Sequence, residues 1–169
     1  VDNDDDDDDD DVEDGHDEND ITREEHHQRY SRYSQGANAI AVGVLAGNIN
    51  QQTNSVAIGN SAGYAAQSKD AIAIGFQAGY SGQSQFAIAI GYQSGFNQGM
   101  SSISIGYQSA YTQGIYSVAI GYFAGRQQSN RSIAIGSYAA VTEQKENALA
   151  IGFASGNMSQ GTYSVAIGY

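Results

Sequence analysis

The sequence predicts an all-β protein whose body is a parallel β-solenoid, and three observations support this prediction. First, a five-residue phrase, exemplified by residues Ala71 to Gly75 (Ala-Ile-Ala-Ile-Gly), occurs nine times between residues 39 and 168. Second, the closing glycines of successive phrases lie 15 or 16 residues apart, a period that fits one solenoid coil and is too short for a helical hairpin. Third, the chain contains no proline, which would interrupt a ladder of hydrogen-bonded strands. Nine phrases predict about eight full coils.

Charge separates an acidic N-terminal region from a nearly neutral body. Residues 1–35 hold 16 acidic and three basic residues, whereas the remaining residues hold three acidic and four basic ones. We therefore expect an Asp-rich tail over 1–21, a short capping helix or a linker over 22–35, and the solenoid over 36–169. The helix is suggested by a capping box in which Thr22 and Glu25 satisfy each other's backbone amides.

The Asp-rich tail has two interpretations. A block of like charges is typical of a solvated segment, but dense carboxylates are also the hard oxygen ligands that calcium prefers. The spacing does not match an EF-hand loop, because Val12 and Ile21 stand where ligands are required. The predicted cation ligands are Asp4, Asp5, Asp6, Asp7, Asp8, Asp9, Asp10, Asp11, Glu13 and Asp14.

Several function classes are not expected. All three histidines lie before the repeats, and the adjacent pair His26 and His27 would diverge by about 100° on a helix, so neither a catalytic cluster nor a histidine metal site is predicted. The body has too few basic residues for a nucleic-acid groove, and its apolar runs are too short to span a bilayer. We therefore expect neither an enzyme, nor nucleic-acid binding, nor membrane insertion.

Within each phrase, branched and small residues alternate, so they point to opposite faces of a strand. We predict that the branched residues fill the coil and that the small ones face outward. Burial of two branched residues per coil stabilises the fold by less free energy than the ordering of 15 or 16 residues costs in conformational entropy. We therefore expect the small face to be buried against other subunits, which would supply further stabilisation. The predicted coil core is Ile72, Ile74, Ile88, Ile90, Ile103, Ile105, Val118, Ile120, Ile133 and Ile135. The predicted oligomer interface is Ala73, Ala89, Ser104, Ala119 and Ala134.

Two further residue types recur at fixed positions. Aromatic residues follow the closing glycine directly in many coils and return four residues later in a second row, from Tyr64 to Tyr111. Glutamines recur late in the coil, where coils stacked about 4.8 Å apart would set their amides in a hydrogen-bonded ladder. A polar binding surface is the alternative reading of these glutamines. They are Gln51, Gln67, Gln83, Gln98, Gln113, Gln128, Gln144 and Gln160.

The phrase Ser-Val-Ala-Ile-Gly at residues 55–59, with its copies, resembles the head repeat of trimeric autotransporter adhesins and similar repeats of phage and giant-virus fibre proteins. The resemblance extends over residues 37–169 and implies a left-handed parallel β-roll that packs as a trimer. It also implies an elongated module at a cell or virion surface. The period differs, since those heads usually repeat every 14 residues.

We therefore expect a structural or adhesive module of an extracellular or surface fibre, with a host surface or glycan as a partner. The alternative is a calcium-binding filament or matrix subunit. In that alternative the strand edge near Tyr169 pairs with the N-terminal region of the next subunit, and calcium bound by the Asp-rich tail neutralises the head-to-tail junction.

Overall fold

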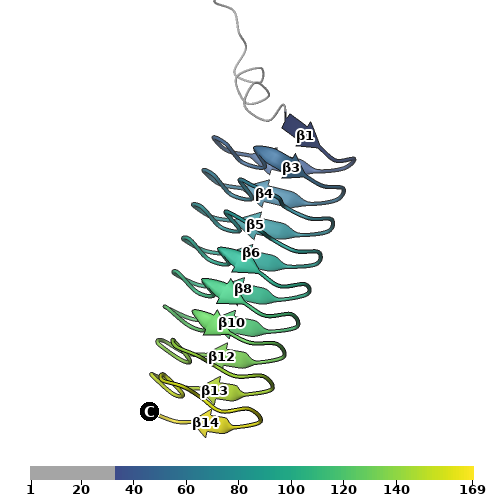
Figure 1. Ribbon diagram of the computed structural model, residues 1–169. Helices are drawn as coiled ribbons and strands as arrows, with labels where there is room; N and C mark the ends of the chain where they lie inside the picture. Colours follow the sequence, from purple (N-terminus) through teal and green to yellow (C-terminus); the bar gives the residue numbers. More distant parts are fainter. Residues whose placement is uncertain (1–32) are drawn as a thin grey trace, which may run out of the picture.

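The computed structural model describes residues 33–169, which wind into a stack of parallel coils (Figure 1). The nine phrases form nine strands that pair in sequence order in one parallel sheet. These strands are β2 (Ile40–Val42), β4 (Val56–Ile58), β5 (Ile72–Ile74), β6 (Ile88–Ile90), β8 (Ile103–Ile105), β10 (Val118–Ile120), β12 (Ile133–Ile135), β13 (Leu149–Ile151) and β14 (Val165–Ile167). The predicted parallel β-solenoid of about eight coils is confirmed.

A second wall of the solenoid is built from shorter strands. β7 (Asn97–Gln98), β9 (Thr112–Gln113) and β11 (Gln127–Gln128) form a three-stranded parallel sheet, and isolated bridges extend this wall on both sides. At the first coil, β1 (Tyr33–Gln35) pairs with β3 (Ile49–Gln51). The end of the segment predicted as a helix or linker is thus a strand, because its backbone adds to the open edge of this wall. The rest of that segment and the Asp-rich tail lie outside the described residues.

The strand register places equivalent residues directly above one another. Ile72 pairs with Ile88, and Ala73 pairs with Ala89, and the same match is kept along the whole sheet. We call a set of equivalent residues in successive coils a column. Every side-chain preference of the repeat is therefore displayed as a line along the solenoid.

The predicted orientation of the phrase is wrong. The small residues Ala73, Ala89, Ser104, Ala119 and Ala134, which we expected at an oligomer interface, are all fully buried inside the chain's own coils. The branched residues that we expected in the core point outward instead and are only half-buried: Ile72, Ile74, Ile88, Ile90, Ile103, Ile105, Val118, Ile120, Ile133 and Ile135.

The width of the coil explains this reversal. The opposite wall comes so close that a Cβ added to Gly79 would lie 3.1 Å from the Cβ of Ala73. The same holds in the last complete coil, where a Cβ on Gly156 would lie 3.2 Å from that of Ala150. A branched side chain at the alanine position would therefore collide with the facing backbone, so only alanine or serine fits the interior.

Candidate functional site

The recurring glutamines lie inside the solenoid. Their side chains are at most 7% exposed, which excludes the alternative of a polar binding surface. Each one reaches across the interior to the nine-stranded sheet. For example, Gln83 Nε2 donates to the carbonyl of Ile72 at 2.6 Å, and Gln98 Nε2 donates to that of Ile88 at 2.9 Å. These bonds tie the two walls of the coil together, so this column is structural.

The predicted glutamine ladder is present over most of its length. Amide-to-amide hydrogen bonds of 2.9–3.3 Å run without a break from Gln83 to Gln160. Nearer the N-terminus, Gln51 and Gln67 donate to main-chain carbonyls, at 2.8 Å in both cases, and Gln67 Oε1 is buried with no partner among the described residues. The prediction is confirmed for the longer part of the column.

The outer surface of the nine-stranded sheet is an aliphatic face, which we define as the two outward branched residues of each phrase. It includes Ile or Val at almost every position, with Leu149 as the exception. In the middle coils neighbouring side chains half-bury one another, whereas at the ends Ile40 is 50% exposed and Ile167 is 70% exposed. A contiguous apolar surface of this extent is typical of a protein interaction site.

Two aromatic columns run along the solenoid at the two positions where aromatic residues recur in the sequence. In the first column, directly after the closing glycine, Tyr92 and Tyr107 stack at 5.0 Å between ring centroids. In the second column, Tyr64, Tyr80, Phe96 and Tyr111 stack in succession at 4.9, 5.9 and 5.0 Å. Desolvation and the neighbouring Tyr138 and Tyr107 raise the pKa of Tyr122, where the first column continues.

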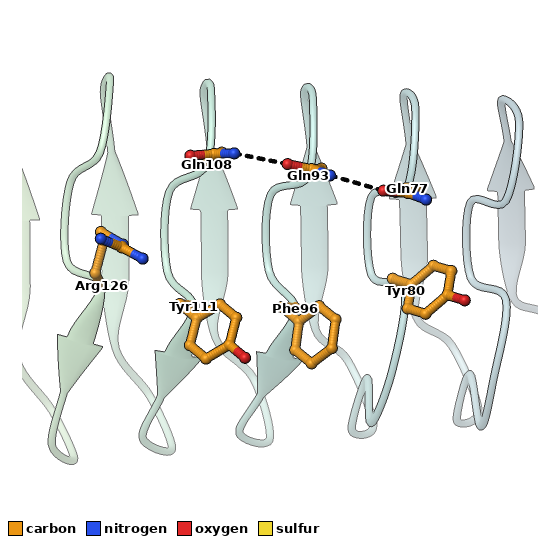
Figure 2. Close-up of a pocket in the computed structure, with 7 residues that line it drawn as sticks. All are labelled: Gln77, Tyr80, Gln93, Phe96, Gln108, Tyr111 and Arg126. Atoms are coloured by element: carbon orange, nitrogen blue, oxygen red, sulfur yellow. Dashed lines mark hydrogen bonds between the residues drawn. The ribbon is translucent and has the colours of Figure 1, made fainter.

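A groove of about 400 Å³ lies between the second aromatic column and a second set of glutamines. Figure 2 shows Tyr80, Phe96 and Tyr111 along one side and the three amides along the other. These amides form an outer ladder, since Gln108 Nε2 donates to Gln93 Oε1 at 2.6 Å and Gln93 Nε2 donates to Gln77 Oε1 at 2.7 Å.

The groove ends at Arg126, which occupies the second aromatic column one coil after Tyr111. Its guanidinium carbon lies 5.4 Å from the centroid of Phe123, a cation–π contact. Arg126 takes part in none of the three ion pairs found within residues 33–169. Our sequence analysis missed this groove. Its signal is an aromatic residue followed by Gln in three successive coils, at residues 76–77, 92–93 and 107–108.

The predicted cation ligands, Asp4 to Asp11, Glu13 and Asp14, lie outside the described residues, so calcium binding stays a prediction. Within the described range, no group of three or more Asp, Glu or His side chains is placed to hold a metal ion. A search of the same range for a helix long and apolar enough to cross a membrane finds none.

Comparison with known proteins identifies the repeat. Residues 98–124 match the YadA head domain repeat, in two copies. The family resemblance predicted from the phrase is thereby confirmed for these coils, and the head domain is a structural adhesin domain, not a class of enzyme. No curated protein and no solved structure matches the chain. The matched residues include β8, β9 and β10 and the groove residues Gln108 and Tyr111, and the remaining coils share their register.

Proposed function

We propose that this chain is a structural or adhesive module of a surface or extracellular fibre, which self-assembles through its aliphatic face. The main observation in support is that small residues and glutamine already fill the coil interior, while the branched residues point outward from every strand. The similarity to the YadA head domain repeat supports an adhesin-like role, and the adhesin resemblance favours a homotrimer.

The energetics of the aliphatic face favour association. The nine strands display two branched residues each, and completing the burial of a half-buried side chain contributes about 1 kcal/mol. Summed over the face, this gain exceeds the roughly 4–15 kcal/mol of lost translational and rotational freedom. A second copy of the chain is the occupant that matches the face best, because its columns have the same spacing along the solenoid axis.

The test is the mass of the full chain in solution, measured by light scattering after size exclusion. We expect a multiple of the 17.8 kDa chain mass. Ile88→Asp should give a monomer that keeps its β-sheet circular dichroism, because the residue lies next to the central strand of the aliphatic face and points outward. The matched control is Met158→Asp, which adds the same charge at an 80% exposed apolar residue of the second wall. A wild-type monomer at micromolar concentration would contradict self-assembly through this face.

A further inference from the structure

The groove is built from two columns in which the solenoid accepts many types of residue. Two residues after the closing glycine, the column contains serine at Ser61 and alanine at Ala154, as well as the three glutamines of the outer ladder. Five residues after it, the column contains asparagine at Asn48 and valine at Val141, as well as the aromatic residues. Since the coil forms with such different residues, three glutamines beside three aromatic rings are not a requirement of the fold.

The outer ladder offers hydrogen-bonding groups of both kinds. The amide of Gln93 uses one N–H and one oxygen lone pair within the ladder, so one of each remains. A hydroxyl group, which donates and accepts, matches this pair of groups. The amides are half-buried beside an open groove, where a ligand can reach them.

The aromatic side of the groove presents ring faces. Tyr80, Phe96 and Tyr111 have interplanar angles of 18° and 11°, but their centroid separations of 5.9 and 5.0 Å show that the rings are offset. Figure 2 shows the three rings in a row that faces the row of amides across the groove. The rings stack on one another, and the parts of each ring that the offset leaves uncovered can contact flat, weakly polar surfaces such as the C–H face of a pyranose ring.

The backbone of the groove walls is already engaged, which argues against an added peptide strand. The amide N–H of Gln93 donates to the carbonyl of Phe76 at 2.8 Å, and the carbonyls of Phe96 and Tyr111 accept bonds of 3.2 and 3.1 Å from the preceding coils. A bound peptide therefore finds no free strand edge here, which β-augmentation requires. Recognition must come from side chains.

We propose that this groove binds an acidic oligosaccharide that runs along the solenoid. Its pyranose rings stack on Tyr80, Phe96 and Tyr111, and its hydroxyls bond to the outer ladder. A uronic-acid carboxylate pairs with Arg126, whose planar fork of N–H groups matches a carboxylate and which has no acidic partner among the described residues.

This inference names a ligand class for the proposed adhesive function. It rests on that function, because only a module at a surface meets a surface glycan. It does not require the aliphatic face, because no groove residue belongs to that face. Self-assembly and glycan binding are therefore separable by experiment.

The test is calorimetric titration of the full chain with a hyaluronan hexasaccharide and, separately, with the same hexasaccharide after reduction of its carboxyl groups. We expect saturable binding of the acidic form and at least about ten-fold weaker binding of the reduced form, since a charge-assisted bond is lost. Arg126→Gln should weaken binding of the acidic form by a similar factor. Phe96→Leu should weaken both forms by roughly three- to ten-fold, because it removes a stacking face at similar volume.

The matched control is Arg131→Gln, which removes one positive charge at an exposed residue outside the groove, where Arg131 pairs with Glu146 at 2.7 Å. It should leave binding unchanged. The proposal is overturned by absence of binding at millimolar hexasaccharide, by equal binding of both forms, or by equal effects of the two arginine variants. If the chain keeps its oligomeric mass but binds no sugar, only this inference fails. If it binds the acidic sugar as a monomer, only the self-assembly proposal fails.

Discussion

The closing glycine of the phrase gives the sharpest test of how the coils are held together. Gly75 has φ of +125°, a conformation that residues with a Cβ rarely adopt. A Cβ at this position would also lie 2.5 Å from the carbonyl oxygen and 2.9 Å from the carbonyl carbon of Gly91 in the next coil. The substitution Gly75→Ala therefore strains one coil and pushes the next coil away.

The expected cost follows from these two effects. Adopting the unfavourable backbone conformation costs about 1–3 kcal/mol. Relief of the contact requires the Gly91 carbonyl to move by about 0.9 Å to reach the 3.4 Å of ordinary contact, which disturbs the bond from Gly91 N to Ile74 O, now 2.8 Å long. Weakening one or two such bonds adds about 1 kcal/mol each. We expect Gly75→Ala to destabilise the array locally by about 2–5 kcal/mol.

The chain provides a matched control four residues later. Gly79 also has a positive φ, of +55°, but the same position in other coils is occupied by Ala110 and Ala140 with φ of 51° and 48°. A Cβ on Gly79 would meet the end of the Gln83 side chain at 2.8 Å, and this amide can shift; it would also lie 3.1 Å from the Cβ of Ala73, a contact that a movement of a few tenths of an ångström relieves. Gly79→Ala should therefore cost only about 1 kcal/mol, the low end for such strain.

Because a solenoid can unfold in parts, hydrogen exchange of the full chain is the appropriate assay, with urea unfolding as a global measure. Gly75→Ala should accelerate amide exchange in β5 and β6 by roughly five- to a thousand-fold relative to Gly79→Ala, since the two costs differ by about 1–4 kcal/mol. If the two variants exchange alike, the close approach of the closing glycines does not limit the stacking of coils, and the reasoning fails.

Three further predictions test the interior, the glutamine column and the tail. Ala89→Leu should lower stability by about 3 kcal/mol or more through overpacking, whereas Ile88→Leu on the aliphatic face should cost less than about 1 kcal/mol, both measured by urea unfolding. Gln98→Leu should cost about 3–5 kcal/mol, because it leaves the buried groups that bond to Gln98 without partners. The half-buried Gln93→Leu should cost about 1 kcal/mol, and equal costs would contradict a structural role for the inner column. Calcium should bind the full chain in a calorimetric titration and fail to bind after deletion of residues 2–20, and identical titrations would refute the predicted cation ligands.

The period of the phrase predicted the solenoid, its parallel strands and its number of coils correctly, because each follows from equal spacing of identical strands. The orientation of the phrase could not be obtained in the same way. The alternating pattern places Ile72 and Ala73 on opposite faces of the strand, but it does not indicate which of them faces the interior. Hydrophobicity alone favours isoleucine in the interior. The distance between the two walls determines which residue fits there, and that distance is set by the bends between the strands.

Those bends are poorly visible in the sequence. Several non-glycine residues hold positive φ, among them Gln77 at 52° and Phe86 at 60°, although neither residue type favours that conformation. The conformational strain of these residues is offset by the hydrogen bonds between coils, which form only in the folded stack. A sequence-based interpretation therefore finds the strands more readily than the turns that bring Ala73 against Gly79.

The solenoid also separates residues that hold the fold from residues that are free to carry function. Closing glycines, inner alanines and inner glutamines contact the next coil or the opposite wall, so a substitution of any one of them displaces the residues that it contacts. The column two residues after the closing glycine accepts residues as different as Gln77 and Ala154, and the column five residues after it accepts both Tyr80 and Val141. A binding site can therefore be built over a few coils without altering the stack. The groove fits this description, since it extends over the coils from Gln77 to Arg126 and ends where arginine replaces an aromatic residue. Its extent follows from these substitutions alone, because the backbone register is the same on either side of it.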